Sequence, residues 1–278
     1  MSIVRQAVLL LATALMLSAV PTDALAARQE AQPNADPAPS EETPGRVLVA
    51  GATGAIGRHV VQDLLARGHH VRGLTRRPEA AREKVPEVEW VGGDLRERES
   101  LAAVVEDIDC IIYAAGSKSW EDPTNTSELI DYGGVRHLAE LGAQAGVTRM
   151  VMISSAWVTR KDARVSERLK SVLAWKKKGE DSLRASGLEF TILRPLGMGT
   201  GPKGQMGIAL FQGDRIESSV YIEREDLAAV AAECAFHPDA RNKTFELFNA
   251  ATMRIDSWKK DLAKMRPDPE PVDASQAR

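Results

Sequence analysis

The stretch that decides the fold runs from Arg46 to Gly57 and reads Arg-Val-Leu-Val-Ala-Gly-Ala-Thr-Gly-Ala-Ile-Gly. A short apolar run stops at three glycines spaced three residues apart, Gly51, Gly54 and Gly57. Apolar residues at helical spacing follow, and Gly68 stands where a helix would end in a left-handed residue. Strand, glycine turn and helix in this order predict the first unit of a dinucleotide-binding fold, because glycine permits a tight bend and a close approach to a pyrophosphate.

The helix that starts after this turn is expected to face the phosphates. Its first N–H groups are free of intrahelical partners, and its dipole places positive charge at this end. The residues expected to line the pyrophosphate are Gly51, Thr53, Gly54, Ala55, Ile56 and Gly57.

The end of the next predicted strand bears on which dinucleotide binds. The apolar run 71–74 is followed by Thr75, Arg76 and Arg77. An acidic residue at this place would hold the ribose 2′-hydroxyl of NAD, whereas arginines suit the 2′-phosphate of NADP. We therefore predict NADP, bound as NADPH, with NAD as the alternative. A solvated pair of loop arginines is the other interpretation of Arg76 and Arg77.

The first 45 residues are expected to lie outside the folded domain. Arg5, the apolar run 7–20 and small residues up to Ala26 are typical of a signal peptide, and the run is short for a membrane span. We expect a signal peptide over 1–26 and an exported, periplasmic or secreted protein, with an uncleaved membrane anchor as the alternative. Residues 27–45 are rich in Pro, Ala and acidic residues, which predicts a disordered linker.

The composition is that of an ordinary globular protein. The 278 residues are 44% hydrophobic and 27% charged, enough for one large domain with a small second lobe. A net charge of −3 gives no reason to expect nucleic acid or an anionic membrane as a partner. Cys110 in an apolar strand and Cys234 on a helix face predict buried thiols. The expected partner is a small-molecule substrate, with no metal and no stable membrane insertion after signal cleavage; the oligomeric state is left open.

Strand and helix patterns alternate along the rest of the chain. Further strands are predicted at 88–91, 110–114, 149–153, 188–193, 219–222 and 244–248. Helices are predicted around 78–83, 101–105, 128–145, 169–186 and 225–236, with a last one starting at Asp256. The glycine-rich segment 196–212 has weak periodicity and is predicted to be a loop over the cleft.

This alternation predicts the α/β class, with a doubly wound parallel sheet of the Rossmann type and helices on both faces. The domain is expected to span 46–265 and to include a small C-terminal substrate lobe from about Leu196. Residues 266–278 are predicted to be a disordered tail.

The carboxyl ends of parallel strands are where such sheets bind ligands. Asp94 follows the third strand, where it could accept a hydrogen bond from an adenine amino group or instead cap the next helix. The small residues 114–116 would let a ribose lie close to the backbone. Ser154 and Ser155 end a central strand, where a hydroxyl is better placed for chemistry than for stability, although a simple turn serine is the alternative.

From about 46 to 250 the chain resembles the atypical short-chain dehydrogenase/reductase superfamily, in its NmrA-like and flavin-reductase-like branches. The motifs that carry this resemblance are Gly51–Gly57, Asp94-Leu95, Ala114-Ala115-Gly116, Asp131-Tyr132-Gly133-Gly134, Ser154-Ser155-Ala156 and Gly187–Pro195. The resemblance implies that Asp94 and Leu95 contact adenine and that 114–116 lie beneath the ribose. It also places Pro195 and Ser154 at the cofactor and Ser155 as the active-site serine.

Catalysis in this family uses a serine, a tyrosine and a lysine four residues after the tyrosine. The lysine holds the ribose and lowers the pKa of the tyrosine, so that the phenol can exchange a proton with a carbonyl or an alcohol. Lys176 matches the lysine by its distance from Glu180 and the following strand. Four residues before it stands Val172, which cannot exchange a proton. Ser155 and Lys176 are therefore the predicted catalytic residues, and alcohol dehydrogenation is in doubt.

The resemblance leaves two functions that need no tyrosine. The first is an NADP-dependent oxidoreductase that transfers hydride to a small carbonyl, quinone or flavin-like acceptor, as flavin, biliverdin and quinone reductases of the superfamily are similar in lacking this residue. The second is a non-catalytic NADP(H)-binding sensor or assembly factor. Sugar-nucleotide epimerisation fits poorly, because it relies on the missing tyrosine.

Overall fold

The structure is a computed structural model that describes residues 45–161, 164–216 and 220–269. All described residues belong to one compact unit of the chain, the second of two, which lies within Thr43–Arg278. The predicted signal peptide and nearly all of the predicted linker lie outside the described residues, as does the part of the predicted tail from 270 onward.

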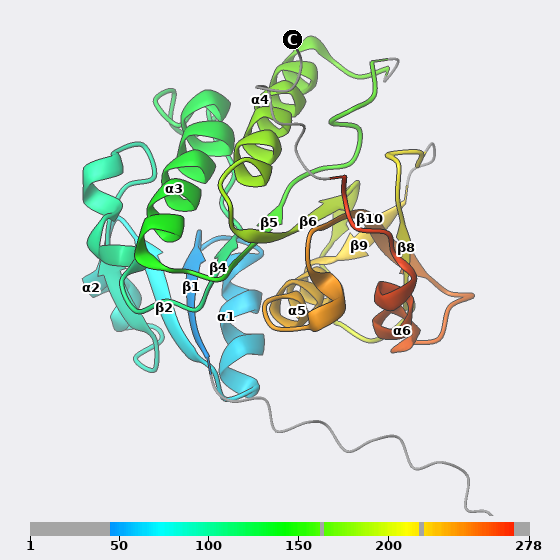
Figure 1. The fold of residues 1–278 in the computed structure, drawn as a ribbon, viewed down its shortest axis with the longest axis horizontal. Coiled ribbons are helices and arrows are strands. Elements are labelled where there is room, and N and C mark those ends of the chain that lie inside the picture. Colours follow the sequence, from blue (N-terminus) through cyan, green and yellow to red (C-terminus); the bar gives the residue numbers. More distant parts are fainter. Residues whose placement is uncertain (1–44, 162–163, 217–219, 270–278) are drawn as a thin grey trace, which may run out of the picture. The chain divides into compact units, whose positions relative to one another are not determined.

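An eight-stranded sheet forms the centre of the second unit (Figure 1). Its strands, in the order in which they lie side by side, are β3 (Glu89–Gly92), β2 (His70–Thr75), β1 (Arg46–Ala50), β4 (Cys110–Tyr113), β5 (Arg149–Ile153), β6 (Glu189–Pro195), β10 (Lys243–Ala250) and β8 (Gly207–Phe211). Every neighbouring pair is parallel except β10 and β8. The predicted doubly wound parallel sheet is therefore confirmed.

Helices cover both faces of this sheet. Their bounds are α1 (Gly57–Ala66), α2 (Pro78–Arg82), α3 (Val135–Ala145), α4 (Glu167–Arg184), α5 (Arg224–Cys234) and α6 (Ser257–Lys264). In Figure 1, α1 and α5 lie on one side of the sheet, and α3 and α4 lie on the other. Shorter turns are η2 (Arg98–Leu101), η3 (Ala103–Val105), the π-helix η4 (Glu128–Gly134) and η5 (Pro238–Ala240).

The central strand β1 shows why the sheet is covered twice. Val47 and Val49 pack in one apolar cluster with α1 and α5, whereas Leu48 and Ala50 pack in the other with α3. All four are fully buried. Because side chains alternate across a strand, a run with no polar residue requires an apolar layer on each face.

The prediction of a helix at 101–105 is wrong, since the structure has two short 3₁₀ turns there, η2 and η3. Ser100 accepts a hydrogen bond from the Asp94 N–H at 2.9 Å and donates to the Glu97 carbonyl at 2.8 Å. Such local bonds satisfy backbone groups outside an α-helical ladder, and Asp107 then turns the chain with φ +55°.

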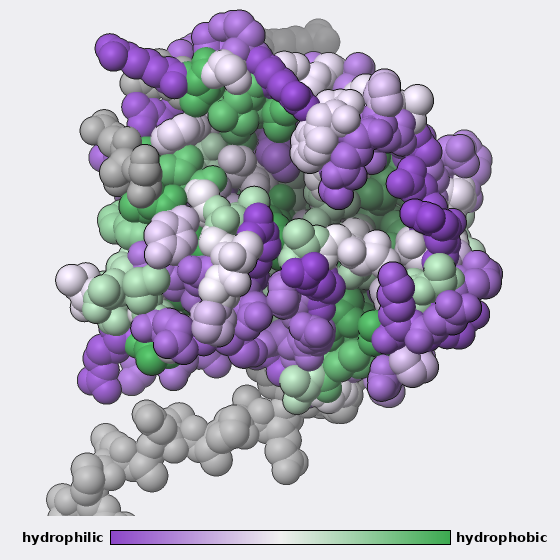
Figure 2. Space-filling model, turned by 180° about the vertical axis from the view of Figure 1, so that it is seen from behind, coloured by the Kyte–Doolittle hydropathy of each residue, from purple (hydrophilic) through white to green (hydrophobic). Residues whose placement is uncertain are grey.

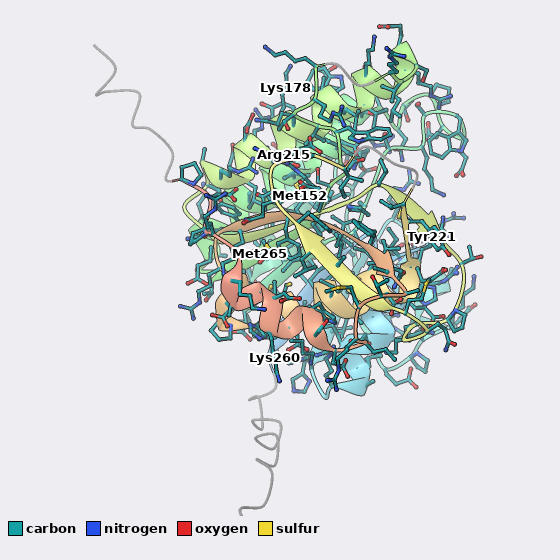
Figure 3. All side chains as sticks on the ribbon, turned by 90° about the vertical axis from the view of Figure 1, so that its right-hand side faces the viewer. Met152, Lys178, Arg215, Tyr221, Lys260 and Met265 are labelled. Atoms are coloured by element: carbon teal, nitrogen blue, oxygen red, sulfur yellow. The ribbon has the colours of Figure 1, made fainter. Side chains whose placement is uncertain are left out.

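The predicted loop at 196–212 is also partly wrong. Residues Gly197–Gly199 form β7, which pairs with β9 (Tyr221–Glu223) in a separate two-stranded sheet, and 207–211 form β8 of the main sheet. β8 is a strand because of its antiparallel partner β10, which lies far away in sequence. The segment predicted as a C-terminal lobe therefore has two parts. Strands β8 and β10 belong to the main sheet, whereas β7 and β9 form the separate two-stranded sheet. Figure 3 views the molecule from the side of α6, which packs against β8.

Residues just before 270 are anchored to the domain. Asp268 accepts hydrogen bonds from the Thr244 N–H at 2.9 Å and from Arg184 Nε at 3.0 Å. Cys110 and Cys234 are free and buried, as predicted, and burial raises the pKa of the Cys110 thiol to about 12.

The surface seen in Figure 2 is largely hydrophilic, with smaller hydrophobic areas between charged residues. Among the described helices, none combines the length and the apolar character that a bilayer crossing requires.

Candidate functional site

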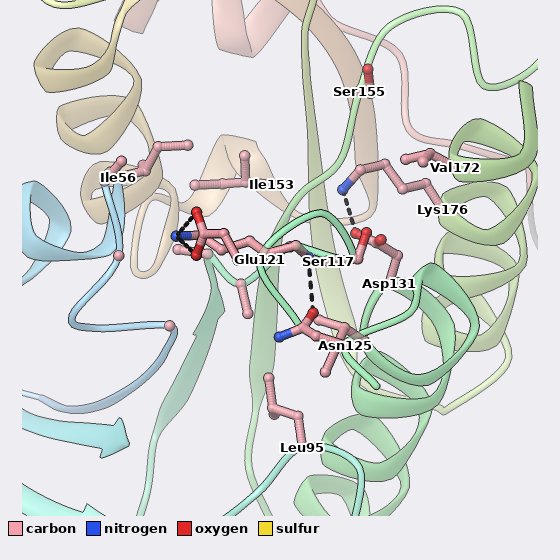
Figure 4. Close-up of a pocket in the computed structure, with 18 of the residues that line it drawn as sticks. Ile56, Leu95, Ser117, Glu121, Asn125, Asp131, Ile153, Ser155, Val172 and Lys176 are labelled. Atoms are coloured by element: carbon pink, nitrogen blue, oxygen red, sulfur yellow. Dashed lines mark hydrogen bonds and ion pairs between the residues drawn. The ribbon is translucent and has the colours of Figure 1, made fainter. Parts of the chain in front are cut away.

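A cavity of about 1030 Å³ opens at the carboxyl ends of the parallel strands. It is lined by sixteen of the predicted site residues: Gly51, Thr53, Gly54, Ala55, Ile56, Arg76, Arg77, Asp94, Leu95, Ala114, Ala115, Gly116, Ser154, Ser155, Lys176 and Pro195. Gly57 is the predicted residue that does not line it. The segments that supply these residues are far apart in sequence, and Figure 4 shows several of them around one space.

The glycine turn depends on the lack of a side chain at Gly51. This residue has φ +83°, and a Cβ built on it would lie 2.7 Å from the backbone nitrogen of Ala115. The turn is closed by a hydrogen bond from the Gly54 N–H to the Gly51 carbonyl at 2.9 Å. Gly57 is buried beneath the turn, where a Cβ would collide with the Gly51 carbonyl oxygen. Gly57 therefore lets the helix start close to the turn but does not face the cavity.

The first turn of α1 meets the cavity at Ile56. No side chain caps this helix end, and its first turn holds no acidic residue. An uncapped helix N-terminus presents N–H groups and partial positive charge, so this edge of the cavity suits an anion such as a pyrophosphate.

The two predicted arginines follow the carboxyl end of β2. Arg76 is 55% exposed in its side chain and approaches the Asp122 carboxylate at 3.8 Å. Arg77 is also exposed, and its backbone N–H donates to Thr75 Oγ1 at 3.2 Å. Both guanidinium groups can therefore turn toward a ligand without breaking a buried interaction.

Asp94 does not cap a helix, because no α-helix begins after it. Its carboxylate is paired with Arg96, which donates from Nε at 2.9 Å and from Nη2 at 2.5 Å. These hydrogen bonds lower the pKa of Asp94 below its usual range. Arg96 also donates to Thr124 Oγ1 at 2.6 Å. An adenine amino group would therefore have to share the Asp94 carboxylate with Arg96. This pairing of Asp94 with Arg96 was not predicted from the sequence.

The opposite end of the cavity holds a buried ion pair. Lys176 Nζ lies 2.8 Å from Asp131 Oδ1, with the two side chains 15% and 1% exposed. Figure 4 shows Lys176 reaching from α4 to Asp131, with Ser155 and Val172 near the same end. Val172, which stands where a catalytic tyrosine would be, lines the cavity with an apolar surface.

The two serines at the end of β5 differ in their environment. Ser154 is buried and donates its hydroxyl to Glu180 Oε1 at 2.7 Å. Ser155 is half-buried and lines the cavity. Ser154 therefore serves to join the strand to α4, and Ser155 has the hydroxyl better placed to meet a ligand.

A buried polar network continues behind Ser154. Arg194 donates from Nε and Nη2 to the Glu180 carboxylate at 2.9 and 2.6 Å and from Nη1 to Glu246 at 3.4 Å. Glu180 and Glu246 are fully buried. Burial raises the pKa of Glu246 to about 6, and hydrogen bonding and the charge of Glu180 raise the pKa of Arg194 against the opposing effect of its burial. This network ties the end of β6 to β10 and to α4 next to the cavity.

The mouth of the cavity is formed by residues that sequence analysis did not identify. Trp120 is 65% exposed, and the Arg168 guanidinium lies 5.5 Å from the centre of its ring. Other lining residues not predicted include Arg96, Lys118, Asp122, Asn125, Asp131, Leu169, Met198 and Arg224. Arg96, Lys118, Asp122 and Asn125 lie on loops without periodicity. Asp131 belongs to the Asp131-Tyr132-Gly133-Gly134 motif, but no role was inferred for its carboxylate.

Comparison with known families identifies the class of protein. Residues 51–238 match the family model described as NAD(P)H-binding, and the chain belongs to that family. The resemblance to atypical short-chain dehydrogenases/reductases is confirmed, and with it a nicotinamide dinucleotide as the cofactor.

Individual relatives agree with this class. The chain is 28% identical to the uncharacterized sugar epimerase YhfK of Bacillus subtilis, over 77% of this chain and 99% of YhfK. A solved Bacillus halodurans protein, grouped with NAD-dependent epimerases/dehydratases, has 27% identity and a TM-score of 0.66, covering 79% of this chain and 97% of that one. The Escherichia coli anaerobilin reductase ChuY shares the fold, with 23% identity, a TM-score of 0.61, and 76% and 99% coverage.

Other relatives match over a smaller part of their length. A 3β-hydroxysteroid dehydrogenase/isomerase of Mycobacterium tuberculosis is 36% identical over 118 residues, which are 40% of this chain and 32% of that protein. This chain therefore spans about a third of that enzyme.

These relatives also correct the predicted location. Protein TIC 62 of Pisum sativum, 29% identical over 55% of this chain and 32% of its own length, is chloroplastic. The photosystem II assembly factor Ycf39 of Synechocystis is 27% identical over 72% of this chain and 61% of its own length. Export to the periplasm or the medium, inferred from an apolar run near the N-terminus, is therefore wrong; such a run is a short pattern of composition and carries less information than similarity across a domain.

Proposed function

We propose that the protein is an NADPH-dependent reductase that transfers hydride to a small carbonyl, quinone or flavin-like acceptor. One observation carries this proposal. A single cavity is lined at one end by a glycine turn suited to a dinucleotide and at the other end by Ser155, Lys176 and Val172. A dinucleotide with its pyrophosphate at the glycine turn would extend along this cavity, and its reactive ring would lie next to these three residues.

The residues present fit the cofactor. The lack of a side chain on Gly51 lets the Ala115 backbone approach the turn, the helix end at Ile56 is uncapped, and the carboxylate of Asp131 is buried beside Lys176. Bound NADPH supplies the hydride. The protein supplies position: the glycine turn holds the phosphates, and Lys176 holds the ribose at the reactive end.

Proton transfer to the reduced acceptor falls to groups other than tyrosine. The Ser155 hydroxyl and the Lys176 ammonium are the proton donors that this end of the cavity offers. Val172 excludes water without taking part in proton exchange. Acceptors whose reduced form is protonated readily by water are therefore favoured over simple alcohols and ketones.

Preference for NADP over NAD rests on Arg76. Its guanidinium is exposed at the cavity edge and bound only loosely, at 3.8 Å from Asp122. Arg96, the neighbouring cation, is committed to Asp94. Arg76, with its exposed neighbour Arg77, is thus available for a 2′-phosphate.

The experiment that tests the proposal compares two glycine substitutions in a titration with NADPH. Gly51→Ala places a Cβ against the Ala115 backbone, so binding should weaken at least about tenfold, as for a loss of about 1.4 kcal/mol. Gly92→Ala is the matched control, because a Cβ there meets only Pro78, at 3.7 Å. Loss of nicotinamide absorbance with quinones, flavins and aldehydes as acceptors then measures turnover. Equal affinity of the Gly51→Ala variant and the wild type would refute the phosphate site.

A second candidate is a non-catalytic NADP(H)-binding sensor or assembly factor. Two observations favour it: Val172 in place of the proton-exchanging tyrosine, and the similarity to the assembly factor Ycf39. Protein that binds NADPH but oxidises it with none of these acceptors would support this second function against the first.

A further inference from the structure

The carboxylate of Asp131 lies in an unusual environment for an ionisable group. Only 1% of its side chain is exposed, and it lines the nicotinamide end of the cavity. Its ion-pair partner is Lys176, yet within the described part of the chain neither carboxylate oxygen has a hydrogen bond of good geometry. The ammonium of Lys176 compensates Oδ1, but no hydrogen bond or ion pair from the described residues reaches Oδ2, and a buried carboxylate oxygen without a donor is costly, so it calls for a donor from a ligand.

The backbone around Asp131 is arranged to hold it there. Asp131 is the central residue of η4, a π-helix of seven residues, and π-helical turns are rare and frequent at functional sites. The facing residue of α4 is Gly179, where a Cβ would collide with the Asp131 carbonyl oxygen. The close approach of η4 and α4 that brings Asp131 to Lys176 therefore depends on this glycine.

Neighbouring donors do not occupy the carboxylate. The buried hydroxyl of Tyr113, on the adjacent strand β4, donates to the Ile130 carbonyl at 2.6 Å. On the cavity side, a Cβ built on Gly116 would lie 3.8 Å from Asp131 Oδ1, an ordinary contact distance. The carboxylate thus faces the segment 114–116, beneath which the ribose is expected.

We propose that Asp131 is a cofactor-binding residue, whose carboxylate accepts a hydrogen bond from a hydroxyl of the nicotinamide ribose while Lys176 donates to the same sugar. An acceptor and a donor side by side match a ribose diol, whose hydroxyls both donate and accept. The Asp131–Lys176 pair then provides the anchoring that a tyrosine at position 172 would otherwise share. This inference rests on the proposed function, since it requires the dinucleotide to lie in this cavity.

The test compares NADPH with adenosine 2′,5′-bisphosphate, which is the adenosine half of NADP and lacks the nicotinamide ribose. Asp131→Asn keeps the shape but removes the charge and half of the acceptor capacity. It should weaken NADPH binding about 10- to 100-fold, the range for a lost hydrogen bond to a charged group, and leave binding of the fragment unchanged. Fragment binding also shows that the variant is folded and that the adenosine site is intact.

A second variant covers the case in which Asp131→Asn leaves Lys176 without a counter-charge and fails to fold. The double variant Asp131→Asn/Lys176→Met removes both charges together and should bind the fragment normally but NADPH weakly. In the Lys176→Met background, the Asp131→Asn change should cost less than in the wild type, because both groups act on one sugar.

The matched control is Asp181→Asn, which removes the partner of Lys177 on the same helix. That pair, at 2.5 Å, has side chains 35% and 53% exposed and lies outside the cavity lining. The Asp181→Asn variant should leave NADPH affinity unchanged.

The proposal is overturned if Asp131→Asn or the double variant binds NADPH as tightly as the wild type. It is also overturned if binding of NADPH and binding of the fragment weaken equally. Wild-type protein that binds neither compound would instead refute the proposed function itself.

Discussion

The two ends of the cavity, which we propose hold the adenosine and the nicotinamide, differ in how their charges are held. At the adenosine end, Arg76 contacts an acidic group at the surface, and the partly buried Asp94–Arg96 pair joins residues two positions apart. At the nicotinamide end, Asp131–Lys176 and Glu180–Arg194 are buried and join separate elements. Exposed pairs exchange partners at little cost, whereas buried pairs do not. The adenosine end can thus adapt to its ligand, and the nicotinamide end is set in advance.

The largest effect is expected from breaking the buried end. Arg194→Met removes two hydrogen bonds at 2.9 and 2.6 Å from the fully buried Glu180 carboxylate. Glu180 keeps the Ser154 hydroxyl at 2.7 Å and Arg184 at 3.3 Å but loses its closest cation, and the loss of one partner from a buried ion pair should lower the free energy of unfolding by about 3–5 kcal/mol. Urea denaturation measures this change. Adding Glu180→Gln to the variant should restore part of the loss, and a decrease below about 1 kcal/mol would contradict the contrast between the ends.

The adenosine end is expected to control the choice of dinucleotide. Arg76→Asp places a negative charge near the proposed 2′-phosphate, so NADPH affinity should fall about 10- to 100-fold while NADH affinity changes little. Fluorescence titration with both dinucleotides measures this. Arg98→Asp is the control with the same charge change, since Arg98 pairs with Glu140 and does not line the cavity. Equal losses for both dinucleotides would remove the argument for NADP.

The buried end should also respond to pH. The pKa of Glu246 is raised from 4.5 to about 6 by burial, so between these values the native state binds the proton more tightly than the unfolded state. The stability from this group is present below about pH 4.5 and is lost as the pH rises through 6, by about 2 kcal/mol. In denaturation curves, the free energy of unfolding should fall less between pH 4.5 and pH 7 for Glu246→Gln than for the wild type. Identical losses would show that Glu246 titrates as in the unfolded chain.

The smallest effect is expected at the less buried adenosine end. Arg96→Met removes the partner of Asp94, but the two side chains are 24% and 16% exposed and water can replace the interaction. The free energy of unfolding at pH 7 should change by less than about 1 kcal/mol. Thermal unfolding measures it, and a change near that of Arg194→Met would mean that the two ends do not differ.

Most of the fold could be predicted because its signals are local. Apolar runs without polar residues indicate strands covered on both faces, and glycines at 51, 54 and 57 mark the turn, so the positions of β1, β4 and β5 agree with prediction within a residue. The errors fall where local signals compete or are missing. Where a helix was predicted, the hydrogen bonds of Ser100 favour 3₁₀ turns. The sequence of β8 has no strand pattern of its own, and this segment is a strand because it pairs with β10.

For the site, the sequence by itself determined which residues gather at the strand ends, because the carboxyl ends of parallel strands share one edge of the sheet. Only the tertiary structure decided which of two adjacent serines is tied to Glu180, that Arg96 occupies Asp94, and that Asp131 meets Lys176. Those outcomes depend on side chains from distant segments reaching the same buried space. Spacing along a chain specifies a strand or a helix, but it does not specify which charges meet when those elements pack.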